Sequence, residues 1–159
     1  MFGRYVNQTA RCIIIYFQLS KFIGAIYRQS KSEINQQIQQ LGVRATQGDL
    51  LLFVHDNPGL SQKEIAHLMV LDPSLVGRDI QELINVGFLK RRQVQQGHLT
   101  NLIFMTSEGI ALTSTIQGII DHWWLAVFDQ AVGIDKQVLT QQLEILYHQV
   151  INTGIGNKE

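Results

Sequence analysis

Two helix N-termini follow each other closely near the middle of the chain, and this feature limits the possible folds most. In the sequence SQKE at 61–64, the serine hydroxyl can accept from the glutamate amide while the glutamate reaches back to the serine amide, as in a capping box. Asp72 then precedes Pro73, and proline suits the first helical position because its missing N–H would have no helical partner there. We predict a short helix over 61–68 and a second over 72–87, ending at a glycine.

After residue 87 the hydrophobic period changes. Residues 88–94 and 99–105 are rich in apolar and branched side chains, and the polar run 95–98 separates them. A β-hairpin is the simplest interpretation of two such segments. Two short helices joined by a tight turn and followed by a hairpin form a winged helix-turn-helix.

Long helical patterns lie on both sides of this unit. Residues 9–40 contain no proline and are apolar over more than one stripe, so we expect this helix to pack on its own domain and on a second copy of the chain. A shorter helix is predicted over 46–56, and two more begin at 106 or 107 and at Asp135. The inward positions that we predict on these helices include Leu50, Leu51, Val54, Ile116, Ile119, Ile120, Trp123 and Val127.

The predicted fold class is mainly α with a small β-hairpin. We expect an N-terminal dimerisation helix over 1–45, a winged helix-turn-helix domain over 46–107 and C-terminal dimerisation helices over 108–159.

Composition is that of an ordinary globular protein. Thirteen basic and thirteen acidic side chains cancel over 159 residues, of which 45% are hydrophobic, so net charge indicates no polyanionic partner. The apolar run 12–27 is interrupted by polar side chains and no cleavage site follows it, so we predict neither a membrane span nor a signal peptide. The single cysteine, Cys12, cannot form an internal disulfide, which favours the cytoplasm.

These motifs, in their order and spacing, resemble the MarR family of transcriptional regulators. The resemblance spans roughly 10–152 and is carried by LSQKEIA at 60–66, LDPSLVGR at 71–78, the segment 83–91 and MTSEG at 105–109. It implies a homodimer whose partner is a pseudo-palindromic double-stranded DNA operator, often released by a small ligand, here a small aromatic or phenolic effector. Such a dimer sets two recognition helices about one duplex turn apart, roughly 34 Å, so that each enters a successive major groove.

Candidate DNA contacts lie on the recognition helix and on the hairpin. Ser74 and the nearby amides can bond a phosphate or a base edge, because a helix N-terminus has free donors. Arg78, one turn later, can contact guanine through two hydrogen bonds or clamp a phosphate. Alternation sends Lys90, Arg91 and Arg92 to different sides of the strand, so two at most face phosphate together. The full candidate set is Ser61, Gln62, Ser74, Leu75, Arg78, Gln81, Lys90, Arg91, Arg92 and His98.

Three features depart from the family pattern. His98 stands nearest to a wing position that commonly holds an arginine in the minor groove, which predicts weaker or pH-dependent wing contact. A glycine within a helix costs about 1 kcal/mol relative to alanine, so Gly77 indicates either a close backbone approach or drift. Between 61 and 107, five basic side chains stand against four acidic ones, so DNA affinity should be modest and steeply salt-dependent, with Arg44 as one possible addition to the basic face. The alternative interpretation of Ser74, Arg78 and Gln81 is a solvated helix face that contacts no DNA.

Effector binding has a weaker signal. Tyr16, His55 and Trp123 are candidates for an effector pocket. Adjacent helix positions point about 100° apart, so at most one of Trp123 and Trp124 lines such a pocket. Packing at an interface is the competing use of both tryptophans.

Redox, metal and enzymatic chemistry have little support. No His or Lys close in sequence lowers the pKa of Cys12, so we expect it to be a packing residue rather than a redox sensor. Asp49, His55 and His122 are the only residues that could imitate the zinc site of some family members, and we expect neither metal nor cofactor. The chain has no glycine-rich phosphate loop, HExxH motif or nucleophile elbow, so we predict that it is not an enzyme.

The sequence therefore predicts a homodimeric, sequence-specific DNA-binding transcriptional regulator, a repressor that a small organic ligand releases. The alternative is a winged-helix dimer that acts as a protein-interaction module and has lost operator binding.

Overall fold

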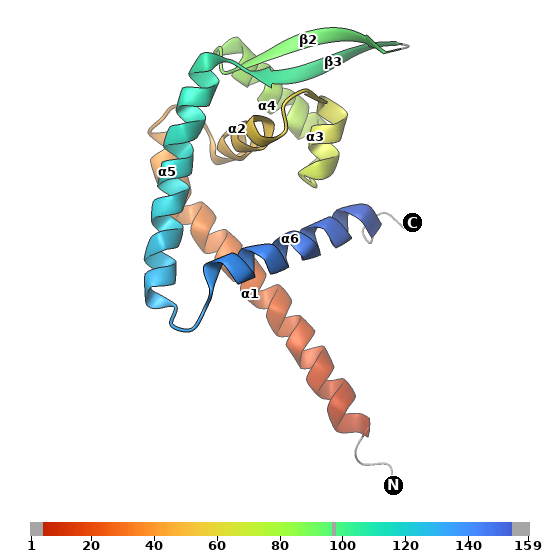
Figure 1. The fold of residues 1–159 in the computed structure, drawn as a ribbon, viewed down its shortest axis with the longest axis vertical. Helices are drawn as coiled ribbons and strands as arrows, with labels where there is room; N and C mark the ends of the chain where they lie inside the picture. Colours follow the sequence, from red (N-terminus) through yellow and green to blue (C-terminus); the bar gives the residue numbers. More distant parts are fainter. Residues whose placement is uncertain (1–4, 97, 154–159) are drawn as a thin grey trace.

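The structure, a computed structural model, describes residues 5–96 and 98–153, with side chains described at 16–95 and 99–152. The chain is mainly helical with one small antiparallel sheet, which confirms the predicted fold class (Figure 1). The elements in chain order are α1 (Tyr5–Gln39), α2 (Ala45–Asp56), β1 (Leu60–Ser61), α3 (Gln62–Leu68), α4 (Pro73–Asn85), β2 (Leu89–Gln96), β3 (His98–Met105), α5 (Ser107–Gln130) and α6 (Lys136–Thr153).

The helix starts are capped as the sequence predicts. The Ser61 hydroxyl accepts from the Glu64 amide at 3.3 Å, and the Glu64 carboxylate accepts from the Ser61 amide at 2.8 Å. Asp72 accepts from the two amides that follow Pro73, and Asp135 accepts from the Gln137 amide at 2.8 Å. Each cap satisfies amides that lack a partner within the helix, so each fixes where a helix begins.

The sheet differs from the prediction in two ways. It has three strands in the order β1-β3-β2, because the two-residue strand β1 pairs with β3 through Leu60 and Ile103. A strand of two residues shows no periodicity, so sequence patterns could not indicate it. The hairpin strands also continue to Gln96 and from His98, so most of the loop expected over 95–98 is strand.

The core lies in the winged helix unit, which we define as α2 through β3. Leu50, Leu51 and Val54 of α2 are almost completely buried, as predicted. They belong to one apolar cluster that also includes Ile38 of α1 and Ile116 of α5, so the bases of both long helices are anchored in the unit. The remaining fully buried apolar side chains come from α3, α4, β2 and β3: Ile65, Val76, Ile80, Leu83, Leu89 and Ile103.

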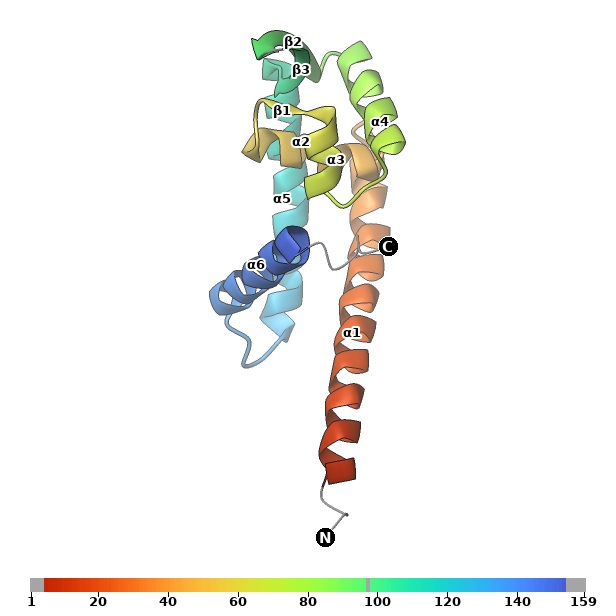
Figure 2. The same ribbon diagram turned by 90° about the vertical axis from the view of Figure 1, so that its right-hand side faces the viewer.

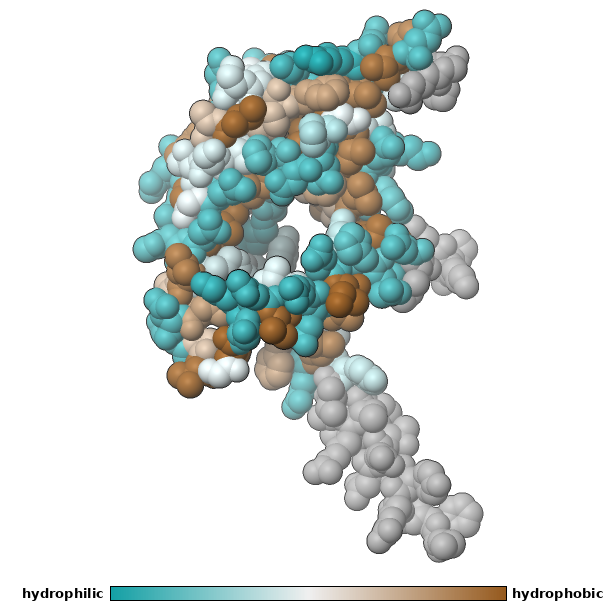
Figure 3. Space-filling model, in the orientation of Figure 1, coloured by the Kyte–Doolittle hydropathy of each residue, from teal (hydrophilic) through white to brown (hydrophobic). Residues whose placement is uncertain are grey.

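Away from this core the helices have few partners. Helices α1 and α5 run away from the unit, and α1 extends beyond the end of α5 (Figure 2). Helix α6 turns back toward the unit, where the Tyr147 hydroxyl donates to the Leu68 carbonyl at 3.0 Å, and an open gap separates most of α6 from the unit (Figure 3). Val127, expected to point inward, is 37% exposed, because it lines the open cleft between α1 and α5. Among the described residues, no helix has the length and apolar character needed to cross a membrane.

Candidate nucleic-acid interface

The outward face of α4 carries Arg78. Val76, Ile80 and Leu83 are buried on the opposite side, which directs Arg78 to solvent. Among the described side chains Arg78 forms no ion pair, although its charge contributes to lowering the pKa of Asp72. A guanidinium held on a helix face without a fixed partner can contact phosphate or a base edge.

The start of α4 is capped by its own carboxylate. Asp72 accepts from the Ser74 amide at 2.9 Å, from the Leu75 amide at 3.1 Å and from the Ser74 hydroxyl. The hydroxyl of Ser74 is the main cause of a pKa for Asp72 below its usual value, and the Leu75 amide adds to it. The free amides expected at this helix start are therefore occupied, and a phosphate could reach them only by displacing Asp72. Leu75 itself is half-buried.

Gly77 has a packing explanation. A Cβ at this position would lie 2.4 Å from Nε2 of Gln62, and that nitrogen donates to the Pro73 carbonyl at 3.2 Å. The missing side chain lets Gln62 lie across the junction of α3 and α4. Gln62, a predicted DNA contact, is thus engaged between the two helices, and Ser61 is engaged in its capping box.

The two acidic residues of α4 share one guanidinium on the side that faces α2. Asp79 is buried, and its carboxylate accepts from the Arg44 guanidinium at 2.5 Å. The same guanidinium donates to Glu82 at 2.7 Å, and Gln47 donates to Glu82 at 2.8 Å. The hydrogen bond to Asp79, followed by that to Glu82, raises the pKa of Arg44. Arg44 therefore serves this network and adds no free charge to the outward face.

The hairpin separates its three basic residues. Arg91 pairs with buried Ile103 across the ladder and donates to the Gln81 side chain at 3.4 Å, so it lies beside α4. Lys90 pairs with Phe104, and the Arg92 guanidinium lies 5.1 Å from the Phe104 ring centroid, on the other face. The predicted alternation is confirmed, and Arg91 is the one that shares a surface with Arg78 and Gln81. Gln81 also donates to Asn85 at 2.9 Å.

For two residues singled out in the sequence, the structure describes the backbone but not the side chain. The backbone of His98 begins β3 and pairs with Gln96, but its side chain is outside the described set. Cys12 lies on α1, and its side chain is also outside that set.

The three effector candidates lie in separate places. The Trp123 indole donates to Glu33 at 2.7 Å and lines a cleft of about 500 Å³ between α1 and α5. This hydrogen bond is the main cause of a lowered pKa for Glu33. His55 lines a different cleft, and Tyr16 is 67% exposed on α1.

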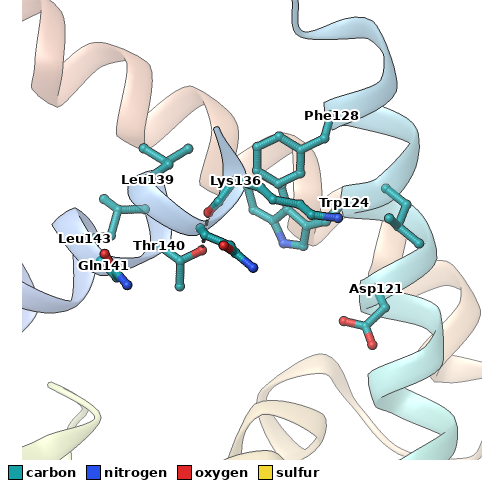
Figure 4. A pocket seen from close by; sticks show the side chains of 10 residues that line it. Asp121, Trp124, Phe128, Lys136, Leu139, Thr140, Gln141 and Leu143 are labelled. Carbon is teal, nitrogen blue, oxygen red and sulfur yellow. Dashed lines mark hydrogen bonds between the residues drawn. The ribbon is translucent and has the colours of Figure 1, made fainter. Parts of the chain in front are cut away.

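The neighbouring tryptophan points into a third cleft, as expected from the angle between adjacent helix positions. Trp124 stacks on Phe128 at 5.7 Å, and both rings line a groove of about 900 Å³ between α5 and α6 (Figure 4). Leu139 and Leu143 of α6 line the same groove. This surface is largely apolar.

The residues considered for zinc do not gather. Within the described side chains no group of three or more His, Cys, Asp or Glu residues is placed to hold a metal ion. Asp49 is instead paired with Lys31 of α1.

Comparison with known proteins shows what this geometry is similar to. The MarR family model matches residues 41–98, which run from the end of α1 to the start of β3. Residues 41–98 of this chain are therefore similar to the MarR family, and the structure around them is a winged helix-turn-helix. The uncharacterised HTH-type transcriptional regulator YybA of Bacillus subtilis strain 168 is 28% identical over 87 residues, which span 55% of this chain and 58% of that protein.

Solved MarR-type structures match nearly the whole chain. A MarR family transcriptional regulator from Listeria monocytogenes, complexed with 26mer DNA, has a TM-score of 0.72 and 23% identity over 87% of this chain and 95% of its own. CouR from Rhodococcus jostii RHA1, bound to p-coumaroyl-CoA, has a TM-score of 0.65 and 26% identity over 86% of this chain and 90% of its own. The likeness to these two structures shows a shared fold.

Proposed function

We propose that this MarR-type chain is a homodimeric, sequence-specific DNA-binding regulator, a repressor released from its operator by a small organic ligand. The observation that carries the proposal is the common surface of α4 and the hairpin, on which Arg78 is exposed and Arg91 lies beside Gln81. The match to a regulator complexed with 26mer DNA supports this use of the fold. Arg78 would contact a base edge and Arg91 a phosphate.

Exposed apolar surface supports the dimer. Helices α1 and α6 expose large apolar side chains over much of their length, although a monomer in water normally buries such groups. Phe17 and Phe22 are 70% and 55% exposed, and Leu146 is 51% exposed. The groove between α5 and α6 is apolar as well. A second copy covering these surfaces would hold two α4 helices in one particle, as a palindromic operator requires.

Ligand release is supported by the position of the cleft beside Trp123. That cleft lies between α1 and α5, whose bases are anchored in the winged helix unit. A ligand there could change the angle between these helices and so the separation of the two α4 helices. Binding energy that differs between the two arrangements is what would drive release.

The interaction module remains the second candidate, and specific contacts favour it. Asp72 caps the start of α4 with negative charge, and Arg44 is committed to Asp79 and Glu82. Both features reduce the positive potential that attracts DNA. If this candidate is right, the dimer exists without a preferred duplex.

Selection of bound duplexes from a random pool, followed by fluorescence anisotropy, tests the proposal. Arg78→Ala should lower affinity for the selected duplex at least about tenfold, because each bidentate base contact contributes roughly 1–3 kcal/mol. Arg92→Ala, which removes a cation on the face of β2 opposite to Arg91, should bind like the parent. Affinity should fall steeply between low and moderate salt. Failure to enrich any duplex with an intact dimer would favour the interaction module.

A reporter gene placed behind the selected duplex tests the repressor role. Expression should fall when the regulator is present and recover when a bound aromatic acid or phenol is added. Higher expression in the presence of the regulator would instead indicate an activator.

A further inference from the structure

One face of the hairpin continues the surface of α4 toward the tip. Side chains directly opposite each other in an antiparallel ladder, and those two positions apart along a strand, lie on the same face. Arg91 pairs with Ile103 and donates to Gln81 of α4, so these two pair members mark the face that meets α4. Toward the tip this face carries four more described side chains, which we call the outer face: Gln93, Gln95, Leu99 and Asn101.

Burial along this face ends beyond the winged helix unit. Ile103 is 1% exposed at the base of the hairpin, whereas Leu99, four positions nearer the tip on β3, is 62% exposed. Asn101 between them is exposed as well. The hairpin extends past α3 at this end (Figure 1), so Leu99 contributes little to the packing of the single chain.

The outer face has no charge among the described side chains. It consists of three amides and one leucine. A narrow minor groove attracts arginine and lysine through its negative potential, and a neutral surface gains little from that potential. Proteins also enter the minor groove with apolar side chains, which wedge between base steps and kink the duplex. Leu99 is the one described residue of the outer face that has this character.

The position of Leu99 suits contact with a minor groove. An antiparallel strand rises about 3.4 Å per residue, so Leu99 lies roughly 14 Å beyond Ile103 toward the tip. The centres of a major groove and the adjacent minor groove are half a duplex turn apart, roughly 17 Å. With α4 in the major groove, the outer face would therefore lie at the flanking minor groove.

We infer that Leu99 is an apolar wedge, which inserts between two base pairs in the minor groove beside each half of the operator and kinks the duplex there. Asn101 on the same face donates to the N3 and O2 acceptors that base pairs present in this groove. Pyrimidine–purine steps such as TA and CA kink most easily, so the preference at this position is for a deformable step. The inference rests on the proposed function and makes Leu99 a specificity-determining residue.

The DNA itself provides the first test, with the parent protein alone. Selection from a random pool should enrich a TA or CA step at a fixed distance outside each half of the operator. Energy transfer between dyes at the two ends of the selected duplex should rise on binding, because kinks bring the ends closer. Replacement of the flexible step by part of an A-tract, which is stiff, should lower affinity roughly tenfold.

Substitutions at Leu99 provide the second test. Leu99→Ala should lower affinity for the selected duplex roughly tenfold and reduce the energy transfer, because most of the apolar wedge is lost. Leu99→Arg should favour an A-tract over the flexible step and should steepen the salt dependence by about one unit of log–log slope per wing. Val94 pairs with Thr100 on the opposite face, so Val94→Ala is the matched control and should bind and bend the duplex like the parent.

Leu99 is exposed, so circular dichroism should show the parent fold in both variants at this position. Loss of affinity and bending in Leu99→Ala, with Val94→Ala unchanged, would support the wedge. A bound duplex that stays straight, a pool without a preferred step, or equal binding by Leu99→Ala and the parent would overturn it. Arg78→Ala would still weaken binding in those cases, so the proposed function would stand. Failure to enrich any duplex would overturn both.

Discussion

At the scale of single residues, the cost of adding a side chain at a glycine depends on whether the nearest atoms belong to the backbone or to a flexible side chain, as Gly109 and Gly77 show. Gly109 lies in the first turn of α5, and a Cβ there would lie 2.1 Å from the Phe88 carbonyl oxygen. That oxygen also accepts from the Thr106 amide at 3.1 Å, so the backbone at this junction is held in place. At Gly77 the neighbouring atom is the end of the flexible Gln62 side chain.

These contacts predict opposite outcomes for the same substitution. Gly109→Ala should destabilise the fold by about 2 kcal/mol or more, since backbone must move. Gly77→Ala should be nearly neutral, because displacement of Gln62 offsets the better helix propensity of alanine. In a Gln62→Ala background, Gly77→Ala should stabilise by about 1 kcal/mol. Urea unfolding measures all four variants, and equal effects of Gly77→Ala in both backgrounds would contradict the explanation.

At the scale of elements, the helix starts determine how the two short helices of the winged helix unit, α3 and α4, are placed. Helix α3 has only seven residues, and its first turn is held by the reciprocal bonds of Ser61 and Glu64. A helix this short is marginal alone, so its cap and the burial of Ile65 and Ala66 hold it. The Ser61 hydroxyl, followed by its amide, lowers the pKa of Glu64.

Removal of this cap should alter stability and its pH dependence together. A group with a lowered folded pKa stabilises above its unfolded value, here 4.5, and loses this contribution as pH falls through the folded value. Ser61→Ala should therefore cost roughly 1 kcal/mol at pH 7, and the difference from the parent should shrink at pH 3. Ser114→Ala on α5 should have little effect at either pH. Urea unfolding at the two pH values is the measurement, and a difference that grows in acid would contradict the assignment.

At the scale of the whole molecule, the distribution of apolar surface is uneven. The winged helix unit holds most of the buried apolar side chains, whereas α1 and α6 leave many of theirs exposed in the single chain. A single chain gains no hydrophobic stabilisation from such surface. We therefore propose that a second copy of the chain covers the exposed apolar side chains of α1 and α6.

Dimerisation can be tested without disturbing the core. Phe22 is 55% exposed on α1, so Phe22→Asp should leave the winged helix unit folded. In the proposed dimer the new carboxylate would be buried without a partner, which should weaken association at least about a hundredfold. Val86→Asp, at a 61% exposed position after α4, is the matched control. Sedimentation equilibrium of the parent and the two variants measures the association constant. A parent that sediments as a monomer would contradict the proposed dimer.

Sequence alone was sufficient for the order of the helices, because each start carries its own local signal. The capping box at Ser61, the Asp72 cap and the change of period after residue 87 act through neighbours close in the chain. The apolar positions of α2 also follow from periodicity. Such signals need no knowledge of what packs where.

Tertiary structure decided which predicted site residues are free. Gln62 and Arg44 are engaged by partners on other elements, Gly77 accommodates one of them, and the cations of β2 divide between two faces only one of which meets α4. The sequence lists donors and charges, but a side chain's availability depends on neighbours that folding brings from 10 to 38 positions away. That is why the fold could be read from local patterns, while the binding surfaces required the packed chain.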